Sequence, residues 1–554
     1  MLMNNNKKRI YIIENEDSFK FSEKKRIISF NRVAFLFFFI LFIFLLYSTK
    51  IIYLGSSSPK QKYQITNKIK NHRADIIDVE GKFIAKSVIT YNIGVKPNLI
   101  KDKKKFLLKL KYSFPELDFN KIENEIDKKK FFYLKKKLTP QKSEEIKLLG
   151  EKSLILEPKI TRIYPDNNLF SHTIGQIDDE NFGVSGIEKN FNNYLKTNIE
   201  PLTMTLDKEI QFLVRQELLN SEKIFKNVGS ASILMNINSG EILSLVSLPD
   251  FDINKRNNIS DKKYINRATK GVYEFGSVFK TFTIAAGFNE KLIEPKDMFN
   301  NLEKKINCGG RTISEYDEDL SQNLSVEEIL IKSGNIGSVK IGQKLGVDKI
   351  KDFLIRIGIL SDIEFDIPEI GKPIPFNWGK CKLLTVSFGH GITTTLIQLA
   401  KGYAIISNGG YDITPTLIKD KNISYANKKR VLSKDVSLKI NQILRRVVIE
   451  GTASLADVEG YNVGGKTGTA LIVENGKYTK KKINTFVSIF PINEPKYVFI
   501  VMLEDTKLSK SYVYNYRNKP GSFVGTPFNT AGWTSVEVAA KIIEKIGPIL
   551  ATKY

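Results

Sequence analysis

An uncharged apolar run near the start of the chain constrains its fold more than any other feature. The run begins at Val33, continues weakly to Leu54 and carries no charge before Lys50. A helix of this length can cross a bilayer with little mismatch. No convincing small-x-small cleavage site follows it, so we expect an uncleaved anchor rather than a signal peptide. The sequence thus predicts a membrane-spanning segment at 33–54 after a tail at 1–32.

The charge of the chain points to a membrane surface rather than to nucleic acid. The chain has 85 Lys and Arg but 60 Asp and Glu, a net charge of +25. Its lysines are scattered, and no zinc-finger spacing or RNA-binding aromatic motif accompanies them. Five basic residues lie in 13–32 and five in 55–74, so the positive-inside rule does not choose an orientation. We therefore expect a membrane protein that does not bind nucleic acid.

The chain of 554 residues is too long for a single compact core, so several folded domains are expected. A polar stalk at 55–74 leads to a mixed accessory (pedestal) domain at 75–226, with strand-like, lysine-rich helical and loop patterns. The second domain, 227–554, begins with two apolar strands joined by a turn at 238–240, continues with helices, and closes with three strands and a helix. This order predicts an α+β fold in which helices pack on an antiparallel sheet.

The two cysteines and three histidines offer no metal-ligand cluster at a usual spacing, so we expect no metal. Cys308 and Cys381 could be free thiols or one disulfide. Cysteines this far apart in a sequence are more often simply buried, which favours two free thiols. His390 lies in a Gly-rich turn, where a lone histidine usually has a structural role. Glu274 is expected to position the loop that follows it, and Trp533 to pack.

Three short motifs carry the candidate chemistry. Each alone is weak, because Ser22, Ser57 and Ser260 also open a Ser-x-x-Lys sequence. Together they are specific, because one opens a helix after a glycine, the next interrupts a helical segment, and the last begins a strand after two glycines. They are S-x-x-K at Ser277 and Lys280, S-x-N at Ser333 and Asn335, and K-T-G-T at Lys466, Thr467, Gly468 and Thr469.

Lys280 is poorly placed for a structural role, because the positive end of a helix disfavours a cation. A serine is a weak nucleophile without a base. A neutral lysine can be that base if its pKa falls from about 10.4 toward neutrality, which costs about 4 kcal/mol. Burial against Phe279 and Phe282 and a positive charge on Lys466 would lower that pKa. The first motif therefore predicts Ser277 as a nucleophile activated by neutral Lys280.

The ordered motifs resemble those of the penicillin-binding transpeptidases and the serine β-lactamases. Three further blocks narrow the resemblance to class B penicillin-binding proteins: "RADIIDVEGKFIA", "RIYPDNNLFSHTIGQ" and "GVSGIEKNFNNYL". Two others, "VSFGHGITTTLIQLAKGYAIISNGG" and "FNTAGWTSVEVAAKII", are similar to the cell-division (FtsI-like) type. The resemblance runs from the anchor to the C-terminus, and it implies an accessory domain followed by a transpeptidase domain.

The resemblance implies a role for each motif residue in acyl transfer from a stem peptide that ends in D-alanyl-D-alanine. It implies no metal or organic cofactor. Ser277 would attack the carbonyl, Lys280 would be its base, Ser333 would relay the proton to the leaving amine and Asn335 would hold the substrate amide; Lys466, Thr467 and Thr469 would bind the terminal carboxylate, Gly468 would keep the strand edge clear, and the backbone N–H groups of Ser277 and Thr469 would form the oxyanion hole.

The activity implied is that of a septal peptidoglycan D,D-transpeptidase, a β-lactam target. It would be a single-pass protein of the inner membrane at the division septum, with its catalytic domain on the periplasmic side. The implied partners are a membrane-embedded septal glycosyltransferase and other division-complex proteins.

Other functions of the same motifs remain as alternatives. One is an elongation-type transpeptidase, and another is a D,D-carboxypeptidase or a β-lactamase-like hydrolase. An intact set of motifs argues against an inactive scaffold. A β-lactam sensor would need a signalling domain, for which the 32 residues before the anchor are too few. The transferase is favoured because the intervening carboxylates do not form the Glu-x-x-x-Asn arrangement that places a water-activating base; they include Asp348, Asp352, Glu364 and Glu369.

Overall fold

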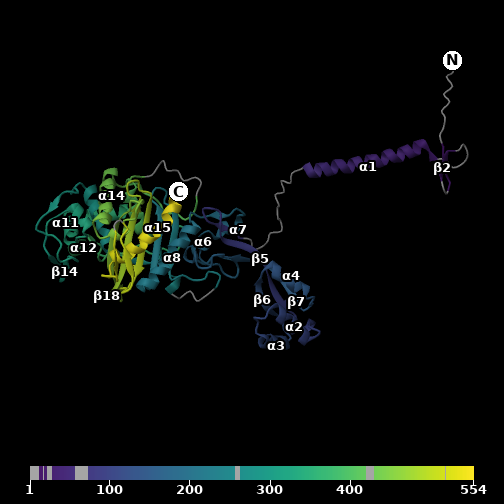
Figure 1. Cartoon of the computed structure of the whole chain (residues 1–554), viewed down its shortest axis with the longest axis horizontal. Coiled ribbons are helices and arrows are strands. Elements are labelled where there is room, and N and C mark those ends of the chain that lie inside the picture. Colours follow the sequence, from purple (N-terminus) through teal and green to yellow (C-terminus); the bar gives the residue numbers. More distant parts are fainter. Residues whose placement is uncertain are drawn as a thin grey trace, which may run out of the picture. The chain divides into compact units, whose positions relative to one another are not determined.

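The structure, a computed structural model, divides into two units, residues 1–70 and 71–554 (Figure 1). Residues 57–72 of the predicted stalk lie outside the described part of the chain, as do Ser57 and Ser260. The described residues are 11–15, 18–21, 28–56, 73–255, 262–419, 429–517 and 520–554.

The apolar run forms one continuous helix, α1 (Phe30–Ser56). Among the described residues it is the one helix long and apolar enough to cross a membrane, over Ala34 to Tyr53. Its side chains are exposed, with Phe44 at 73%, an arrangement that favours lipid over water as the surroundings. Three short strands precede it in the antiparallel order β2-β1-β3: β1 (Tyr11–Asn15), β2 (Ser18–Phe21) and β3 (Ile28–Ser29).

A mixed sheet organises the first part of residues 71–554. Its central strand, β5 (Phe83–Val95), pairs with β4 (Ile76–Ile77) across a turn at Gly81, and with β6 (Phe132–Leu138) and β7 (Leu154–Ile163). Three helices pack on the far end of β5 and share a separate apolar core with it, the lobe at the bottom of Figure 1. They are α2 (Lys103–Ser113), α3 (Phe119–Asp127) and α4 (Pro140–Leu148).

A buried ion cluster joins the three accessory blocks quoted from the sequence. Glu188 accepts hydrogen bonds from Arg73 Nε at 2.5 Å, Arg162 Nε at 2.8 Å and the Tyr164 hydroxyl at 3.1 Å. The side chains of Arg73, Arg162 and Glu188 are fully buried in this cluster. The shorter elements around it are η1 (Pro97–Leu99), α5 (Ser171–Ile174), α6 (Gly186–Asn190), α7 (Asn192–Thr197) and β8 (Leu202–Thr203), which pairs in parallel with β4.

An antiparallel five-stranded sheet forms the centre of the second part, as the strand-helix-strand order predicts. Its first two strands meet at the 238–240 turn. The last strands of the chain complete it, and the strand that carries Lys466 lies at its edge. The order is β10 (Ile242–Leu248), β9 (Gly229–Asn236), β19 (Tyr497–Glu504), β18 (Lys477–Phe490) and β17 (Gly464–Glu474).

Helices cover both faces of this sheet, and β9 and β19 are therefore buried along almost their whole length. Helices α8 (Lys208–Phe225) and α15 (Ser535–Lys553) pack together as one layer, although they come from distant parts of the chain (Figure 1). Helices α13 (Leu396–Ser407) and α14 (Lys434–Ile449) pack on the sheet as the other. Strands that are buried on both faces have mostly apolar sequences rather than alternating apolar and polar residues.

Helix α10 starts with a capping box at Ser325 and Glu328. It is one of the remaining elements, which stand around the sheet. They are η2 (Lys262–Tyr264), β11 (Val272–Tyr273), η3 (Gly276–Phe279), α9 (Lys280–Asn289), β12 (Met298–Phe299), β13 (Lys305–Cys308), β14 (Arg311–Ser314), β15 (Leu324–Ser325), α10 (Val326–Ile331), α11 (Asn335–Arg356), α12 (Lys380–Val386), β16 (Thr394–Thr395), η4 (Ser454–Ala456), β20 (Val513–Asn515), β21 (Ser522–Val524) and η5 (Ala531–Trp533).

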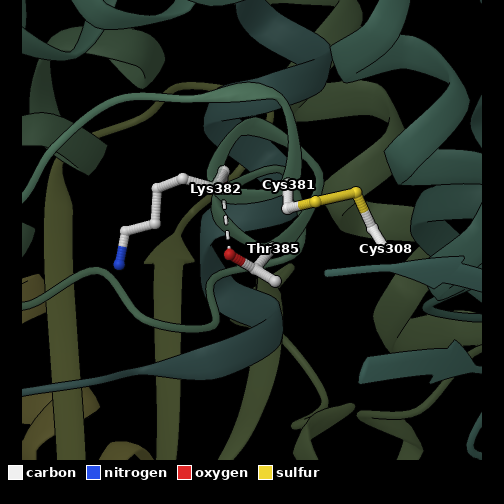
Figure 2. Close-up of a disulfide and its surroundings, with 4 residues drawn as sticks. All are labelled: Cys308, Cys381, Lys382 and Thr385. Atoms are coloured by element: carbon white, nitrogen blue, oxygen red, sulfur yellow. Dashed lines mark hydrogen bonds between the residues drawn. A yellow bond between two sulfur atoms is a disulfide. The ribbon is translucent and has the colours of Figure 1, made fainter. Parts of the chain in front are cut away.

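Cys308 and Cys381 form a disulfide, so the expectation of two free thiols is wrong. Their Cα atoms lie 5.5 Å apart, within the range that a disulfide spans. Cys308 ends β13 and Cys381 lies in the first turn of α12 (Figure 2). The 73 residues between them in sequence do not separate them in space, because the β13–β14 hairpin folds back onto α12.

The buried ion cluster makes a testable contribution to stability. Glu188→Ala would leave the guanidinium groups of Arg73 and Arg162 buried without their carboxylate. We expect the free energy of unfolding to fall by about 3–5 kcal/mol, because breaking one partner of a buried pair strands the other charges. Thermal unfolding of the detergent-solubilised full chain measures this loss.

The matched control is Glu144→Ala, which removes an exposed carboxylate paired with Lys147 one helical turn away. Exposed pairs contribute about 0–1 kcal/mol, so its unfolding midpoint should barely move. Equal midpoints for the two variants would contradict a stabilising role for the cluster.

Candidate active site

The three motifs meet in one cleft, of about 880 Å³. The S-x-x-K motif lies on η3 and the start of α9, S-x-N lies at the junction of α10 and α11, and K-T-G-T lies on the edge strand β17. The structure therefore brings together segments that are far apart in the sequence. Of the predicted site residues, five line the cleft directly: Ser277, Ser333, Asn335, Thr467 and Thr469.

Ser277 lies in a 3-10 turn rather than in the first turn of an α-helix. In this geometry side chains three residues apart eclipse each other, which aligns Ser277 with Lys280. Gly276 precedes the turn with φ +58°, and a Cβ there would lie 2.6 Å from the Thr469 carbonyl oxygen. The turn is therefore pressed directly against β17, and only glycine fits at that contact.

Lys280 is fully buried at the base of the cleft. Its Nζ donates to Asn335 Oδ1 at 2.7 Å, to Ser333 Oγ at 3.2 Å and to the Ser333 carbonyl oxygen. These acceptors orient the amine along a fixed direction. The aromatic rings of Phe279 and Phe282, both buried, flank the start of α9.

A second buried lysine reaches the same serine oxygen. Lys466 Nζ donates to Ser333 Oγ at 3.0 Å and to the Thr467 carbonyl oxygen at 3.1 Å, and its side chain is fully buried. Ser333 itself has φ +62°, a left-handed conformation that costs a non-glycine residue about 1 kcal/mol or more. The surrounding hydrogen bonds hold this serine between the two amines.

Burial lowers the pKa of both lysines. It brings the pKa of Lys280 to about 7, against an opposing effect of the Glu315 carboxylate, which raises it. Burial also holds the pKa of Lys466 well below its usual range, and the nearby charge of Lys280 lowers it further. Because both amines contact Ser333 Oγ, a proton on either one disfavours a proton on the other. A neutral lysine at working pH follows from this placement.

Asn335 links Lys280 on α9 to the end of β14. Its Oδ1 accepts from Lys280, and its Nδ2 donates to the Ser314 carbonyl oxygen at 2.8 Å. An amide nitrogen carries two hydrogens, so one remains for a substrate carbonyl. The predicted substrate role of Asn335 is compatible with this arrangement and stays a prediction.

Some of the K-T-G-T residues line the cleft, and others are packed beneath it. The Thr467 hydroxyl lies 2.7 Å from that of Thr452. The Thr469 hydroxyl donates to Asn484 Oδ1 at 3.0 Å and accepts from the Ala531 N–H at 3.0 Å. Both hydrogen bonds of the Thr469 hydroxyl are made within the protein. The backbone N–H of Thr469 is therefore the group of this residue that is better placed to bind a substrate.

Gly468 has a packing role that the sequence does not indicate. A Cβ at this position would lie 2.1 Å from the Phe275 carbonyl oxygen. The glycine thus allows β17 to approach the turn that carries Ser277. The prediction that Gly468 also clears the strand edge for a substrate peptide stays a prediction.

Three more residues singled out in the sequence also line the cleft. His390, for which a structural role is expected, lines the cleft and stacks on Tyr478 at 4.8 Å between ring centroids. Glu274 accepts from the Gly391 N–H at 3.0 Å and from the Tyr478 hydroxyl, so it positions the 389–391 loop. Trp533 packs on Phe523 as expected, and it also lines the cleft.

Glu315 is the main residue that the motif search misses. Its carboxylate lines the cleft and accepts backbone N–H bonds from Asn335 at 2.6 Å and Ile336 at 2.7 Å. The sequence signal that could have found it is the acidic segment 315–319, which precedes the S-x-N motif with β15 and α10 between them.

Comparison with known proteins assigns the family. Residues 230–520, more than half of the chain, match the penicillin binding protein transpeptidase domain, and residues 68–218 match the penicillin-binding protein dimerisation domain. The chain belongs to the class B penicillin-binding proteins. Its FtsI-like resemblance is also confirmed.

Curated relatives of this penicillin-binding protein cover most of its length. It is 27% identical over 500 residues to the probable peptidoglycan D,D-transpeptidase FtsI of Caulobacter vibrioides, covering 88% of this chain and 82% of that protein. It is 27% identical over 540 residues to the stage V sporulation protein D of Bacillus subtilis, covering 86% and 82%.

The fold of this penicillin-binding protein is also similar to a solved structure. A peptidoglycan synthetase from Bifidobacterium adolescentis matches it with a TM-score of 0.65 at 21% identity, over 87% of this chain and 96% of the other. At this identity the likeness establishes the shared fold, helices on an antiparallel sheet.

The buried lysine pair predicts the pH dependence of acylation. Lys280 is a base only when neutral, so the rate of acylation by a penicillin should rise about tenfold per pH unit below about 7 and level off above it. Lys466→Ala removes an amine whose proton disfavours a proton on Lys280, so we expect the pKa of Lys280 to rise and the acid limb of the pH–rate profile to move to higher pH. Lys280→Arg should lose acylation, since a guanidinium stays protonated. Stopped-flow measurement of the acylation rate across pH gives the acid limb of the profile for the wild type and each variant.

The control is Lys332→Ala, which removes an exposed lysine from the same cleft. Solvent screens its charge, so the limb should stay in place. If Lys466→Ala also leaves the acid limb of the profile at the same pH, the charge of Lys466 does not affect the pKa of Lys280. Burial is then the cause of the lowered pKa.

Proposed function

We propose that this penicillin-binding protein is a peptidoglycan D,D-transpeptidase that crosslinks stem peptides through an acyl-enzyme on Ser277. One observation carries the proposal: two buried lysines converge on Ser333 Oγ in a cleft that Ser277 also lines. This arrangement provides a nucleophile, a neutral base and a proton relay. The transpeptidase family and the curated relatives support the same activity.

Acylation begins when neutral Lys280 takes the proton of the Ser277 hydroxyl. The oxygen attacks the carbonyl carbon between the two D-alanines, and the C–N bond breaks as the tetrahedral intermediate collapses. Ser333, which Lys280 contacts, relays the proton to the leaving nitrogen. D-Alanine departs as a neutral amine, and the donor peptide remains as an ester of Ser277.

Deacylation runs the same relay in reverse. The amine of a neighbouring stem peptide attacks the ester carbonyl, and its proton passes through Ser333 to Lys280. The C–O bond breaks, Ser277 regains its proton and a new peptide bond joins the two stems. A base that serves both half-reactions must exchange its proton readily, which a pKa of about 7 allows.

The other motif residues bind and stabilise. The backbone N–H groups of Ser277 and Thr469 come from two segments in direct contact, and we assign them to the oxyanion hole, a large part of catalysis in acyl transfer. We assign the substrate amide to Asn335. The terminal carboxylate would be bound by Lys466, Thr467 and Thr469, with Gly468 beside the peptide.

The cleft favours transfer to an amine over hydrolysis. None of the four carboxylates considered as water-activating bases lines the cleft in the described structure; Glu369, for example, accepts from the Gly186 N–H. Two of the cleft carboxylates, Glu274 and Glu315, are engaged by backbone N–H groups, and the other two, Asp317 and Glu318, lie exposed on the loop after β14. An ester at Ser277 should therefore wait for an amine, and a β-lactam should form a lasting adduct.

The disulfide supports export of the catalytic part. Disulfides form and persist in oxidising compartments, and Cys308 and Cys381 lie on β13 and α12 of the catalytic part. With α1 as a single anchor, we place residues 1–32 in the cytoplasm and 55–554 on the periplasmic side of the inner membrane. Septal localisation, and partnership with a membrane-embedded septal glycosyltransferase and other division-complex proteins, extend the proposal by family likeness. Nucleic acid has no part in it.

Labelling with a fluorescent penicillin tests the activity. The full chain in detergent should form one covalent adduct on Ser277, and Ser277→Ala should abolish it while the thermal midpoint is kept. The adduct should persist for many minutes after free penicillin is removed, a deacylation barrier above about 20 kcal/mol. Intact mass over time measures both.

Two outcomes would contradict the proposal. Labelling that persists in Ser277→Ala, or maps to Ser260 or Ser333, would remove the nucleophile assignment. Turnover of many penicillin equivalents per minute would identify a hydrolase. Release of more than one equivalent of D-alanine per enzyme from a pentapeptide substrate only when an amine acceptor is present would support the transferase directly.

Protease treatment of spheroplasts tests the topology. Residues 73–554 should be digested in intact spheroplasts, because they are exported, and a tag fused before residue 1 should be protected until the membrane is lysed. A cytoplasmic reporter protein controls for lysis. Protection of the large C-terminal part in intact spheroplasts would reverse the assignment.

A further inference from the structure

A hairpin outside the three motifs holds the Ser333–Asn335 turn in place. Strand β14 ends at Ser314, whose carbonyl oxygen accepts from Asn335 Nδ2 at 2.8 Å. The next residue, Glu315, accepts the backbone N–H groups of Asn335 and Ile336 at 2.6 and 2.7 Å. Three hydrogen bonds therefore connect this short segment to the start of α11.

The Glu315 carboxylate makes strong hydrogen bonds because it lies at the N-terminus of α11. Helix α11 starts at Asn335 without a side-chain cap from its own N-cap residue, Gly334. The first N–H groups of a helix lack partners within it, and its dipole attracts a negative charge there. Glu315 supplies both an acceptor and a charge from another part of the chain. In doing so it fixes the residues on either side of Gly334, which are Ser333 and Asn335.

The disulfide ties this hairpin to the opposite side of the cleft. Cys308, on β13, is bonded to Cys381 on α12 (Figure 2). Helix α12 runs into Ser387, whose carbonyl oxygen accepts from Thr283 on the nucleophile helix at 2.9 Å. Two residues later, a Cβ on Gly389 would lie 2.0 Å from the Gly276 carbonyl oxygen. The bridge thus links the Ser333 side of the cleft with the Ser277 side.

We propose that Glu315 is a positioning residue for acylation, and that the Cys308–Cys381 disulfide holds its hairpin in the working position. The inference rests on the proposed function, since it concerns how Ser333 and Asn335 are presented to Lys280. The hairpin acts as a clamp: it sets the separation between the relay serine on one segment and the base on another. Misplacement of a catalytic group by about 1 Å can cost about 100-fold in rate.

The charge of Glu315 provides a second readout that a purely structural role would not change. Lys466 on β17 shares Ser333 Oγ with Lys280. The other titratable groups of the cleft come from several elements: Glu274 before η3, Glu315, Asp317 and Glu318 after β14, Lys332 after α10, His390 after α12 and Lys482 on β18. Glu315 raises the pKa of Lys280. Its removal should therefore lower that pKa and move the acid limb of the acylation profile to lower pH, opposite to the shift expected for Lys466→Ala.

The first test compares three variants of the full chain by stopped-flow acylation with a fluorescent penicillin. Glu315→Gln should lower the plateau rate by about 10- to 100-fold and move the acid limb to lower pH. Glu315→Asp keeps the charge, so the limb should stay, while its shorter reach lowers the rate. Glu318→Gln removes an exposed carboxylate from the same loop and cleft, and it should change neither.

The second test is a double-mutant cycle with the disulfide. Cys308→Ala/Cys381→Ala should lower the acylation rate and shift the limb in the same direction as Glu315→Gln. Combining the two changes should add little, because both release the same clamp. Reduction of the wild type to two thiols by a phosphine, followed by alkylation, gives the same comparison without substitution, and thermal unfolding identifies any variant that fails to fold.

The results separate the clamp from the proposed function. A Glu315→Gln variant with the rate and limb of Glu318→Gln would overturn the positioning role. Full additivity of the cysteine and Glu315 changes would overturn the link through the disulfide. Either could occur while Ser277 remains the labelled residue, whereas failure of the proposed function would appear in the wild type as labelling elsewhere or rapid turnover.

Discussion

The burial of two lysine amines around one serine oxygen is the constraint on which the rest of the site depends. Lys280 and Lys466 are both fully buried and both donate to Ser333 Oγ. Two ammonium groups in such a place repel each other and lose their hydration. The fold keeps them there because α9, the α10–α11 junction and β17 each supply one of the three residues. This destabilising burial lowers the pKa of Lys280, so that its amine can act as a base.

The same chain handles buried charge in a different way in its accessory part. Arg73 and Arg162 are buried too, but they share the Glu188 carboxylate and the Tyr164 hydroxyl. Their charges are compensated, and the cluster joins three segments of the accessory part. Around Lys280 the compensation is incomplete, and the strained φ of Ser333 and the close packing at Gly276 add further cost. Incomplete compensation of this kind is typical of functional sites.

Support for the site extends well beyond the three motifs. Glu315 caps α11 from a separate hairpin, and the disulfide connects that hairpin to α12. Glu274 and Tyr478 hold the 389–391 loop on another wall. These contacts add to the hydrogen bonds among the motif residues and help to determine how rigidly those residues face one another. The disulfide supports the proposed topology, in which the cleft faces the oxidising side of the membrane.

The sequence by itself determined the features that depend on local pattern. Apolar length predicts α1, the 238–240 turn predicts the β9–β10 hairpin, and the spacing of three motifs predicts their residues and the family. Tertiary structure alone decided the rest. The pairing of Cys308 with Cys381, the capping of α11 by Glu315 and the contact of Gly468 with Phe275 join segments that are distant in sequence. No local pattern encodes such contacts, because they exist only once the hairpin, the edge strand and the nucleophile turn have packed against one another.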